Sequence, residues 1–227
     1  MSRIVESWAP GYLALEVGCG TGTVLRCLEK VCRKGRVVGM DRYGESFRFA
    51  RKQTAAGLIQ GDVHAPPFSV APKLIGLFDV LEHLPDDIRV LRDLYDLLAP
   101  DGTLILTVPA HMALWSYSDV AAHHARRYER RELIEKLTRC GFQVERASYF
   151  MFATLPVLRF ARWWQGRHTS SGEEEFDESL ELLSREFRVV PIVNGVLKGL
   201  LAWEPLCLRA GITLPTGSSL IAVAKKV

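Results

Sequence analysis

The stretch Leu15–Thr23 reads LEVGCGTGT: an acid, and then a glycine at every second position, follow a run of apolar residues. An apolar run before a glycine-rich turn predicts a buried strand that ends in a loop close to a ligand, because glycines let the backbone approach it. In an open α/β sheet, ligands bind outside the carboxyl ends of the strands. The stretch therefore predicts a nucleotide-binding loop after the first strand of such a sheet.

Strand-like and helix-like segments alternate over the first two thirds of the 227 residues. Strands are expected at 12–18, 36–41, 58–62, 73–82, 102–110 and 142–150, and helices at 21–35, 45–57, 86–100 and 130–141. Helices between successive strands imply parallel pairing with right-handed crossovers, and hence a doubly wound α/β sheet. The pattern changes after Phe150, and 218–226 is again strand-like. We therefore expect a domain over 1–148 plus 217–227, with a helical insertion or lid over 149–216.

Composition excludes several classes of protein. A net charge of +3 gives no support for a nucleic-acid binder, which usually shows a strongly basic face. The five cysteines form no CxxC pair, and no signal peptide is evident, so we expect reduced thiols and a cytoplasmic location. The longest apolar run, 189–208, is interrupted by Asn194, Lys198, Glu204 and two prolines, so it predicts a soluble or interfacial segment.

The glycine spacing limits the classes of nucleotide that this loop could bind. Gly18, Gly20 and Gly22 form G-x-G-x-G, and Thr23 occupies the place of the third glycine in a dinucleotide fingerprint. No Gly-Lys-Ser/Thr follows, which excludes a Walker phosphate loop. The loop therefore suits an adenosine whose 5′ substituent is not a pyrophosphate.

Acids end the first three expected strands. Asp41 is placed to accept from ribose hydroxyls, Asp62 from an adenine amino group beside the apolar edge of Val63, and Glu16 from an ammonium group. The alternative is that the glycines are ordinary turn residues and the acids are solvated strand-end caps. Three acids around one loop favour a cationic ligand, and S-adenosylmethionine carries both a sulfonium and an ammonium group.

Five blocks in order, LEVGCGTG, VVGMD, GDVHAPPF, DVLEHLPDD and LLAPDGTLILTVP, resemble a class I S-adenosylmethionine-dependent methyltransferase over about residues 13–144. The resemblance implies a Rossmann-like seven-stranded sheet whose last strand, 218–226, runs antiparallel after the insertion. It implies cofactor contacts from Glu16, Gly18, Cys19, Gly20 and Gly22 to the methionine part, Asp41 to the ribose, Gly61, Asp62, Val63 and Arg42 to the adenine, and Phe78, Asp79 and Val80 near the methyl group.

A second conspicuous segment, 108–133, resembles the variety found in bacterial methyltransferases linked with glycan or lipid assembly. There His111, Trp115, Asp119, His124, Arg126, Arg127 and Tyr128 would form a segment that folds over the active-site mouth. Glu129 takes the place of the Ser or Thr that often precedes the helix expected over 130–141. Glutamate caps a helix less well, so the start of this helix is expected to fray. The adjacent His123 and His124 fit no standard tetrahedral zinc spacing, so no metal is expected.

An oxygen acceptor must lose a proton, and histidine suits that role at neutral pH. The candidates for the general base are His83, His111 and His124, although His83 could instead hold a helix start and His124 could order the lid. Arg126 and Arg127 could clamp an acidic acceptor or simply provide surface charge. Residues 150–168 are aromatic and basic, typical of an interfacial amphipathic helix or of a packed lid, and either predicts a partly apolar acceptor.

The sequence thus predicts a methyltransferase that uses S-adenosylmethionine and acts on oxygen of a small-molecule or lipid- or glycan-linked acceptor. It would be cytoplasmic, with peripheral membrane contact as an option. Two other interpretations stay open: a non-catalytic methyltransferase-like binding partner, which disrupted ligand acids would have favoured, and a nicotinamide-dependent oxidoreductase, which the glycine spacing disfavours.

Overall fold

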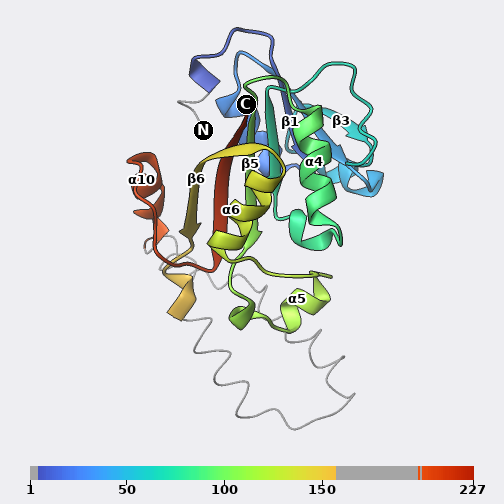
Figure 1. Ribbon diagram of the computed structural model, residues 1–227. Helices are drawn as coiled ribbons and strands as arrows, with labels where there is room; N and C mark the ends of the chain where they lie inside the picture. Colours follow the sequence, from blue (N-terminus) through green and yellow to red (C-terminus); the bar gives the residue numbers. More distant parts are fainter. Residues whose placement is uncertain (1–4, 157–198, 200) are drawn as a thin grey trace. The chain divides into compact units, whose positions relative to one another are not determined.

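The computed structural model describes residues 5–156, 199 and 201–227. A seven-stranded sheet has the order β3-β2-β1-β4-β5-β7-β6, and β7 runs antiparallel between β5 and β6 (Figure 1). The strands are β1 (Leu13–Val17), β2 (Arg36–Asp41), β3 (Gly57–Gln60), β4 (Leu74–Phe78), β5 (Thr103–Pro109), β6 (Phe142–Phe150) and β7 (Ser219–Lys226). The predicted Rossmann-like sheet with an antiparallel last strand is confirmed.

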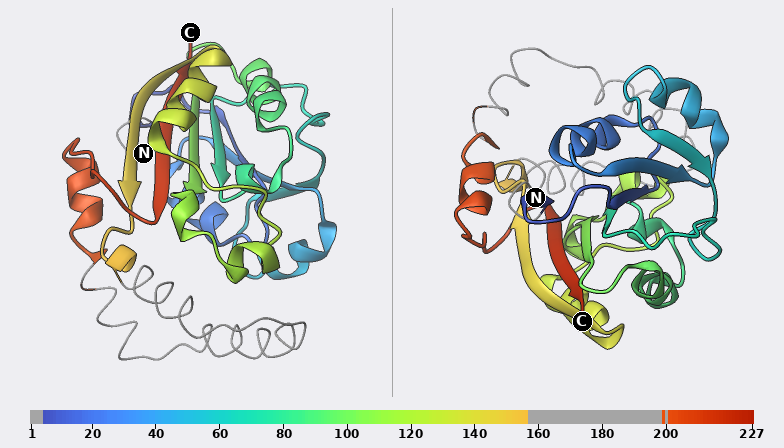
Figure 2. Two further views of the ribbon diagram at one scale, coloured as in Figure 1. Left: turned by 60° about the horizontal axis from the view of Figure 1, so that its bottom comes forward. Right: turned by 90° about the horizontal axis from the view of Figure 1, so that it is seen from above.

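Helices cover both faces of this sheet. Figure 2 shows α2 (Thr23–Val31) on one face, and α4 (Asp87–Leu97) and α6 (Arg130–Arg139) on the other. Central strands are apolar and buried on both sides, as β4 shows with its first four residues fully covered. One part of the core joins Ala14 of β1, Leu28 of α2 and Ile105 of β5. The order of strands reverses between β1 and β4, so their carboxyl ends form the expected ligand edge.

Several predicted elements are shorter than expected, among them the helix over 21–35, which is observed as α2 and ends at Val31. The helix expected over 45–57 is a 3₁₀ turn, η1 (Gly44–Ser46), followed by α3 (Phe47–Ala50). Turn hydrogen bonds continue to Thr54, whose N–H donates to the carbonyl of Ala50, and the Thr54 hydroxyl donates to Glu29 of α2 and accepts from the N–H of Ala56. Gly57, expected to end the helix, instead opens β3 opposite Val38.

The strand expected over 73–82 ends at Phe78. Asp79 has a φ of +52°, which breaks the extended backbone, and a short 3₁₀ helix η2 (Leu81–His83) follows. His83 therefore lies in a turn after β4 rather than at the end of an extended strand.

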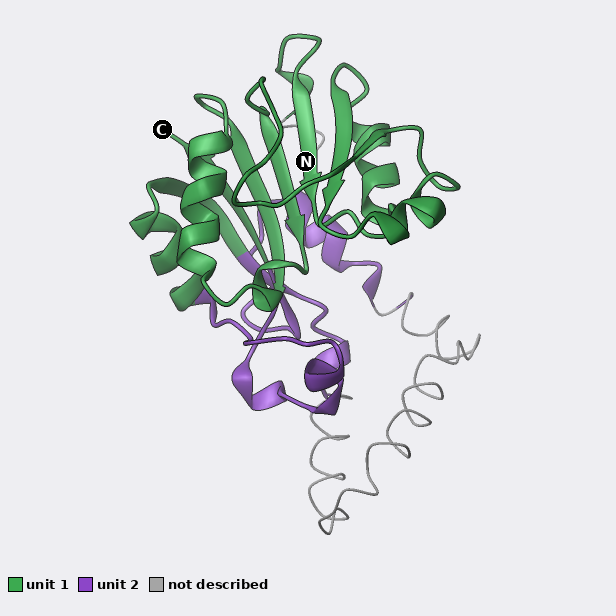
Figure 3. Ribbon diagram, turned by 90° about the vertical axis from the view of Figure 1, so that its right-hand side faces the viewer, with its two compact units in different colours: residues 1–108, 131–147, 221–227 green, residues 109–130, 148–220 purple. Residues whose placement is uncertain are grey.

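The chain divides into two compact units, coloured separately in Figure 3. The first contains residues 1–108, 131–147 and 221–227, and the second contains 109–130 and 148–220. The second unit includes η3 (Met112–Leu114), α5 (Tyr117–Ala121) and α10 (Glu204–Arg209). Much of the predicted insertion, and the predicted amphipathic helix beyond residue 156, lies outside the described residues. Among the helices that the structure does describe, none has the length and apolar character needed to cross a membrane.

Candidate functional site

The glycine loop, residues 18–22, connects β1 to α2 in a conformation that favours glycine. Gly18, Gly20 and Gly22 have φ values of +74°, +47° and +82°. The N–H groups of Gly18 and Cys19 donate to the carbonyl of Met40 at 2.8 and 3.1 Å, which ties the loop to β2. A Cβ on Gly18 would lie 2.4 Å from a methyl carbon of Val80, so this position has no room for a side chain. The loop is thus held close to the ends of both neighbouring strands.

Asp41 ends β2 and binds the glycine loop directly. Its Oδ2 accepts from the N–H of Gly20 at 2.8 Å, and its Oδ1 accepts from the N–H of Tyr43 at 2.9 Å. Each carboxylate oxygen has a second lone pair, so these bonds leave capacity for two hydroxyl donors. Asp41 therefore caps its strand end and still presents the acceptors that a ribose diol requires.

Glu16 is the most unusual group of the loop region. Its side chain is 2 % exposed, and within the part of the chain that the structure describes Oε2 has no hydrogen-bond partner. Burial and, as the smaller cause, the nearby Asp41 carboxylate together raise the pKa of Glu16 to about 8. A buried carboxyl oxygen without a partner is costly unless the group is neutral or a ligand completes it.

The predicted adenine edge lies next to Asp41 in the same unit. The N–H of Gly61 donates to the carbonyl of Asp41 at 3.0 Å, and Val63 is 8 % exposed. Asp62 closes a tight turn, because its Oδ1 accepts from the N–H of His64 at 2.9 Å. This bond is what the alternative interpretation expects, in which Asp62 only caps the end of its strand. It occupies one lone pair of the carboxylate and leaves the others available.

Phe78, Asp79 and Val80 follow the end of β4. Val80 lies against the loop at Gly18, and the Phe78 ring covers Gly76, where an added Cβ would meet it at 2.5 Å. The Asp79 carboxylate accepts from the Thr107 hydroxyl at 3.0 Å. Predicted cofactor residues from β1, β2 and β4 are therefore brought to one edge of the sheet, although no described contact assigns a role to the Arg42 side chain.

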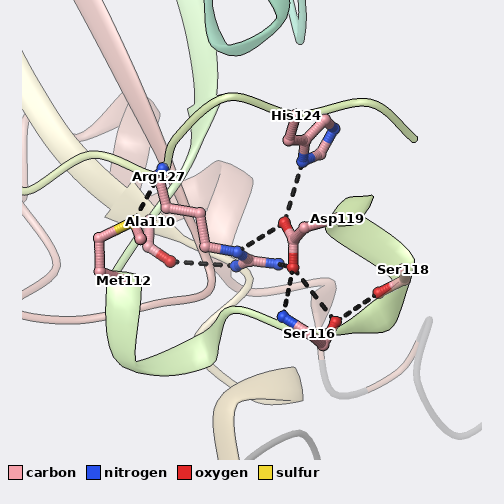
Figure 4. Close-up of polar contacts among 7 residues, drawn as sticks. All are labelled: Ala110, Met112, Ser116, Ser118, Asp119, His124 and Arg127. Carbon is pink, nitrogen blue, oxygen red and sulfur yellow. Dashed lines mark hydrogen bonds and ion pairs between the residues drawn. The ribbon is translucent and has the colours of Figure 1, made fainter. Parts of the chain in front are cut away.

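In the second unit, a buried ion cluster is built around Asp119, which is 1 % exposed (Figure 4). Arg127 donates to both carboxylate oxygens, from Nε at 2.7 Å and from Nη2 at 3.0 Å, and its Nη1 donates to the carbonyl of Ala110 at 3.1 Å. The N–H of Ser116 donates to Oδ2 at 2.9 Å, which completes a capping box at the start of α5. Arg127, expected as a clamp for the acceptor or as surface charge, instead holds this cluster together.

His124 completes the Asp119 cluster. Its Nδ1 lies 2.9 Å from Asp119 Oδ1. Burial would raise the pKa of Asp119, but hydrogen bonds from Arg127 and His124 outweigh it and the pKa is lowered. An ionised carboxylate can only accept, so Nδ1 of His124 carries the proton of this hydrogen bond. The cluster thus fixes the orientation of the ring and the proton on Nδ1.

His111 belongs to a different network of the second unit. Its Nδ1 lies 3.0 Å from Glu129 Oε1, its Nε2 lies 3.2 Å from the Thr216 hydroxyl, and its ring stacks on Tyr149 at 4.8 Å. The Tyr149 hydroxyl donates to Glu129 Oε2 at 3.1 Å. Both nitrogens of His111 are engaged, which favours an ordering role, and Glu129 has partners beyond a helix cap. Tyr149 could not be predicted from the sequence, because its partners are distant along the chain.

Comparisons with known proteins match this chain to methyltransferases. A family model described as a methyltransferase domain matches residues 11–147. A ubiquinone biosynthesis O-methyltransferase of Xanthomonas campestris pv. campestris is 31 % identical over 116 residues, covering 46 % of this chain and 48 % of that protein. A trans-aconitate 2-methyltransferase of Methylobacterium radiotolerans is 33 % identical over 104 residues, covering 44 % and 39 %. The chain thus spans less than half the length of these relatives.

A solved structure of an S-adenosylmethionine-dependent methyltransferase from Mesorhizobium loti has the same fold. It aligns with a TM-score of 0.56 and 15 % identity, over 99 % of this chain and 95 % of that one. The likeness covers the described fold and says nothing of an acceptor.

Proposed function

Because the chain belongs to the class I S-adenosylmethionine-dependent methyltransferases, we propose that it transfers a methyl group from this cofactor to an oxygen atom of a small-molecule or lipid- or glycan-linked acceptor. The relative from Xanthomonas is named as an O-methyltransferase, which supports the choice of oxygen. The observation that carries the proposal is the pairing of His124 with the buried Asp119, because an oxygen acceptor has a proton to lose.

The residues of the first unit fit the cofactor. A Cβ at Gly18 would clash with Val80, so the backbone there is free of side-chain atoms. Asp41 keeps lone pairs that can accept from the ribose hydroxyls. The buried Oε2 of Glu16 has no described hydrogen-bond partner and can pair with the ammonium group. When bound, S-adenosylmethionine supplies a methyl group on a positively charged sulfur. Much of the catalysis is then positioning, because the donor is already activated.

Among the three candidate histidines, we assign the general base to His124. The ionised Asp119 holds the proton on Nδ1 and stabilises the imidazolium that forms when Nε2 accepts a proton. His111 has both nitrogens engaged and is assigned an ordering role. His83 is the second candidate, because it follows the end of β4 in the same unit as the glycine loop.

Exposed apolar side chains of the second unit support an acceptor that is partly apolar, and peripheral contact with a membrane. Phe152 and Trp203 are each 39 % exposed and pack edge to face, and Leu206 and Ile212 are more than half exposed. Replacing Leu206 by glutamate is expected to lower sedimentation with anionic phospholipid vesicles while leaving cofactor binding unchanged. Equal sedimentation of the variant and wild type would contradict membrane contact through this surface.

The test of the proposed reaction is transfer of label from methyl-labelled S-adenosylmethionine to a panel of carboxylic acids, phenols and polyprenyl-linked glycans. We expect labelled methyl esters or ethers with one of these classes, and a loss of kcat of about 10²-fold or more in His124→Asn but not in His111→Asn. Transfer to amines alone would contradict the choice of oxygen. Binding of S-adenosylhomocysteine without transfer to any class would support the non-catalytic alternative, and tight binding of NADH would support the oxidoreductase.

A further inference from the structure

The environment of Glu16 implies more than a contact with the cofactor. In the parallel register, Glu16 lies between Gly39 of β2 and Gly76 of β4. Paired residues of parallel strands point to the same face of the sheet, so no side chain stands beside Glu16 on either neighbouring strand. The Glu16 carboxyl group is therefore flanked by two residues without side chains, and other parts of the fold must cover it.

Apolar and weakly polar groups fill the space above the two glycines. An added Cβ on Gly39 would meet Leu25 at 2.7 Å and the Cys19 sulfur at 2.8 Å, and one on Gly76 would meet the Phe78 ring. These groups explain why Glu16 is 2 % exposed, and burial likewise raises the pKa of Cys19 to about 12. Water is therefore largely excluded from one oxygen of the carboxyl group.

Among the residues that the structure describes, the charged group that acts on Glu16 is the Asp41 carboxylate, which ends β2 on the same face as Gly39. The Cys19 thiol is neutral near pH 7, because its pKa is raised far above that value. A buried acid beside a second acid cannot readily ionise, so the surroundings favour the neutral form of Glu16.

We propose that Glu16 is protonated in the cofactor-free protein and releases this proton to solvent when a ligand with an ammonium group binds at the glycine loop. The O–H bond of the carboxyl group breaks, the proton passes to the buffer, and the carboxylate that remains pairs with the ammonium group. The inference rests on the proposed function, since the ligand is its cofactor. It makes Glu16 the residue by which the site selects an adenosine that carries a cation.

The coupling has a defined pH dependence. Below the pKa of Glu16, about 8, each binding event must displace a proton, so affinity for the ligand rises by up to about tenfold per pH unit as the pH increases. Above that value the carboxyl is already ionised, and both the proton release and the rise in affinity end. A ligand that lacks the ammonium group shows neither effect.

The experiment is calorimetric titration with S-adenosylhomocysteine in pairs of buffers that have different heats of ionisation and hold the pH: phosphate and imidazole at pH 6.5, and CHES and ethanolamine at pH 9. We expect release of about one proton per site at pH 6.5 and almost none at pH 9. In Glu16→Gln, which keeps the size of the side chain, binding should release no proton at either pH. 5′-Methylthioadenosine, which has no ammonium group, should bind the wild-type protein without proton release.

The outcomes separate the two proposals. Binding of S-adenosylhomocysteine at pH 6.5 without proton release would overturn the inference and leave the proposed function intact. Equal proton release in wild type and Glu16→Gln would overturn it as well, because another group would then be the source. If S-adenosylhomocysteine does not bind at all, the proposed function fails together with the inference. The wild-type titrations need no variant, so they decide the question even if Glu16→Gln does not fold.

Discussion

The backbone N–H of Gly20 donates a hydrogen bond of 2.8 Å to the carboxylate of Asp41, 21 residues further along the chain. The same carboxylate accepts from Tyr43, so one side chain joins the loop after β1 to the turn after β2. Removing it should both loosen the glycine loop and take away the acceptors for the ribose.

We therefore expect Asp41→Ala to lower affinity for S-adenosylhomocysteine at least tenfold, since the loss of two hydrogen bonds to an ionised group exceeds about 1.4 kcal/mol. Calorimetric titration measures the effect. Glu145→Ala is the matched control, because it removes an acid that pairs with Lys225 on other strands of the sheet. Unchanged affinity in Asp41→Ala would remove Asp41 from the cofactor site.

Alanine substitutions at Gly18 and Gly20 separate two effects on stability: a steric clash of the new side chain, and the strain of a positive φ in a residue that is not glycine. Both have positive φ, but an added Cβ on Gly18 would lie 2.4 Å from Val80, whereas one on Gly20 would meet nothing within 4 Å. Gly20→Ala should lower the free energy of unfolding by about 1–2 kcal/mol, and Gly18→Ala by about 1–3 kcal/mol more. Urea denaturation measures both values, and Gly18→Ala combined with Val80→Ala should recover part of the loss. Equal losses in the two single variants would show that the close approach at Val80 does not matter.

The Asp119 cluster should be the main ionic contribution to stability in the second unit. Asp119→Asn leaves the Arg127 guanidinium without its buried counter-ion, and breaking such a pair costs about 3–5 kcal/mol. The control is Glu135→Gln, which breaks an ion pair with Arg131 whose side chains are 58 % and 92 % exposed; it should cost less than about 1 kcal/mol. Similar free energies of unfolding for the two variants would refute this account.

The cluster also predicts a response to acid. The pKa of Asp119 is lowered from its ordinary value of 3.8 in the folded protein, so its stabilising effect is present above 3.8 and is lost as the pH falls further. Wild type should therefore lose stability between pH 4 and more acidic conditions, and Asp119→Asn should lose less. Unfolding followed by circular dichroism at several acidic pH values would reveal the difference, and parallel curves would contradict it.

Glu16 predicts a pH dependence of the opposite sign. Its pKa is raised from 4.5 to about 8 on folding, so its contribution is present below 4.5 and is lost as the pH rises through 8. Relative to wild type, cofactor-free Glu16→Gln should gain stability by up to about 1.4 kcal/mol per pH unit across this range. Denaturation in urea at pH 5, 6.5 and 8 measures the gain. A constant difference between the two proteins would mean that Glu16 titrates normally.

Local pattern determined much of this protein. The alternation of apolar strands and amphipathic helices predicted the doubly wound sheet, and the observed bounds of β2 and β6 match the expected residues. The glycine spacing and the acids at strand ends predicted the cofactor loop, because these features depend on residues close together in the chain. The prediction of one continuous helix over 45–57 was wrong: α3 ends at Ala50, and the Thr54 hydroxyl bonds Glu29, 25 residues away.

Only the tertiary structure decided how the polar side chains are paired. In sequence, Arg127 could clamp an acceptor or lie on the surface, yet it is committed to Asp119. His111 was indistinguishable from His124 until Tyr149 and Thr216, 38 and 105 residues away, were found beside it. The protonation of Glu16 likewise depends on two glycines in other strands and on exclusion of water. Secondary structure follows from short-range sterics and burial, whereas pKa values and hydrogen-bond partners are set by groups that only the folded chain brings together.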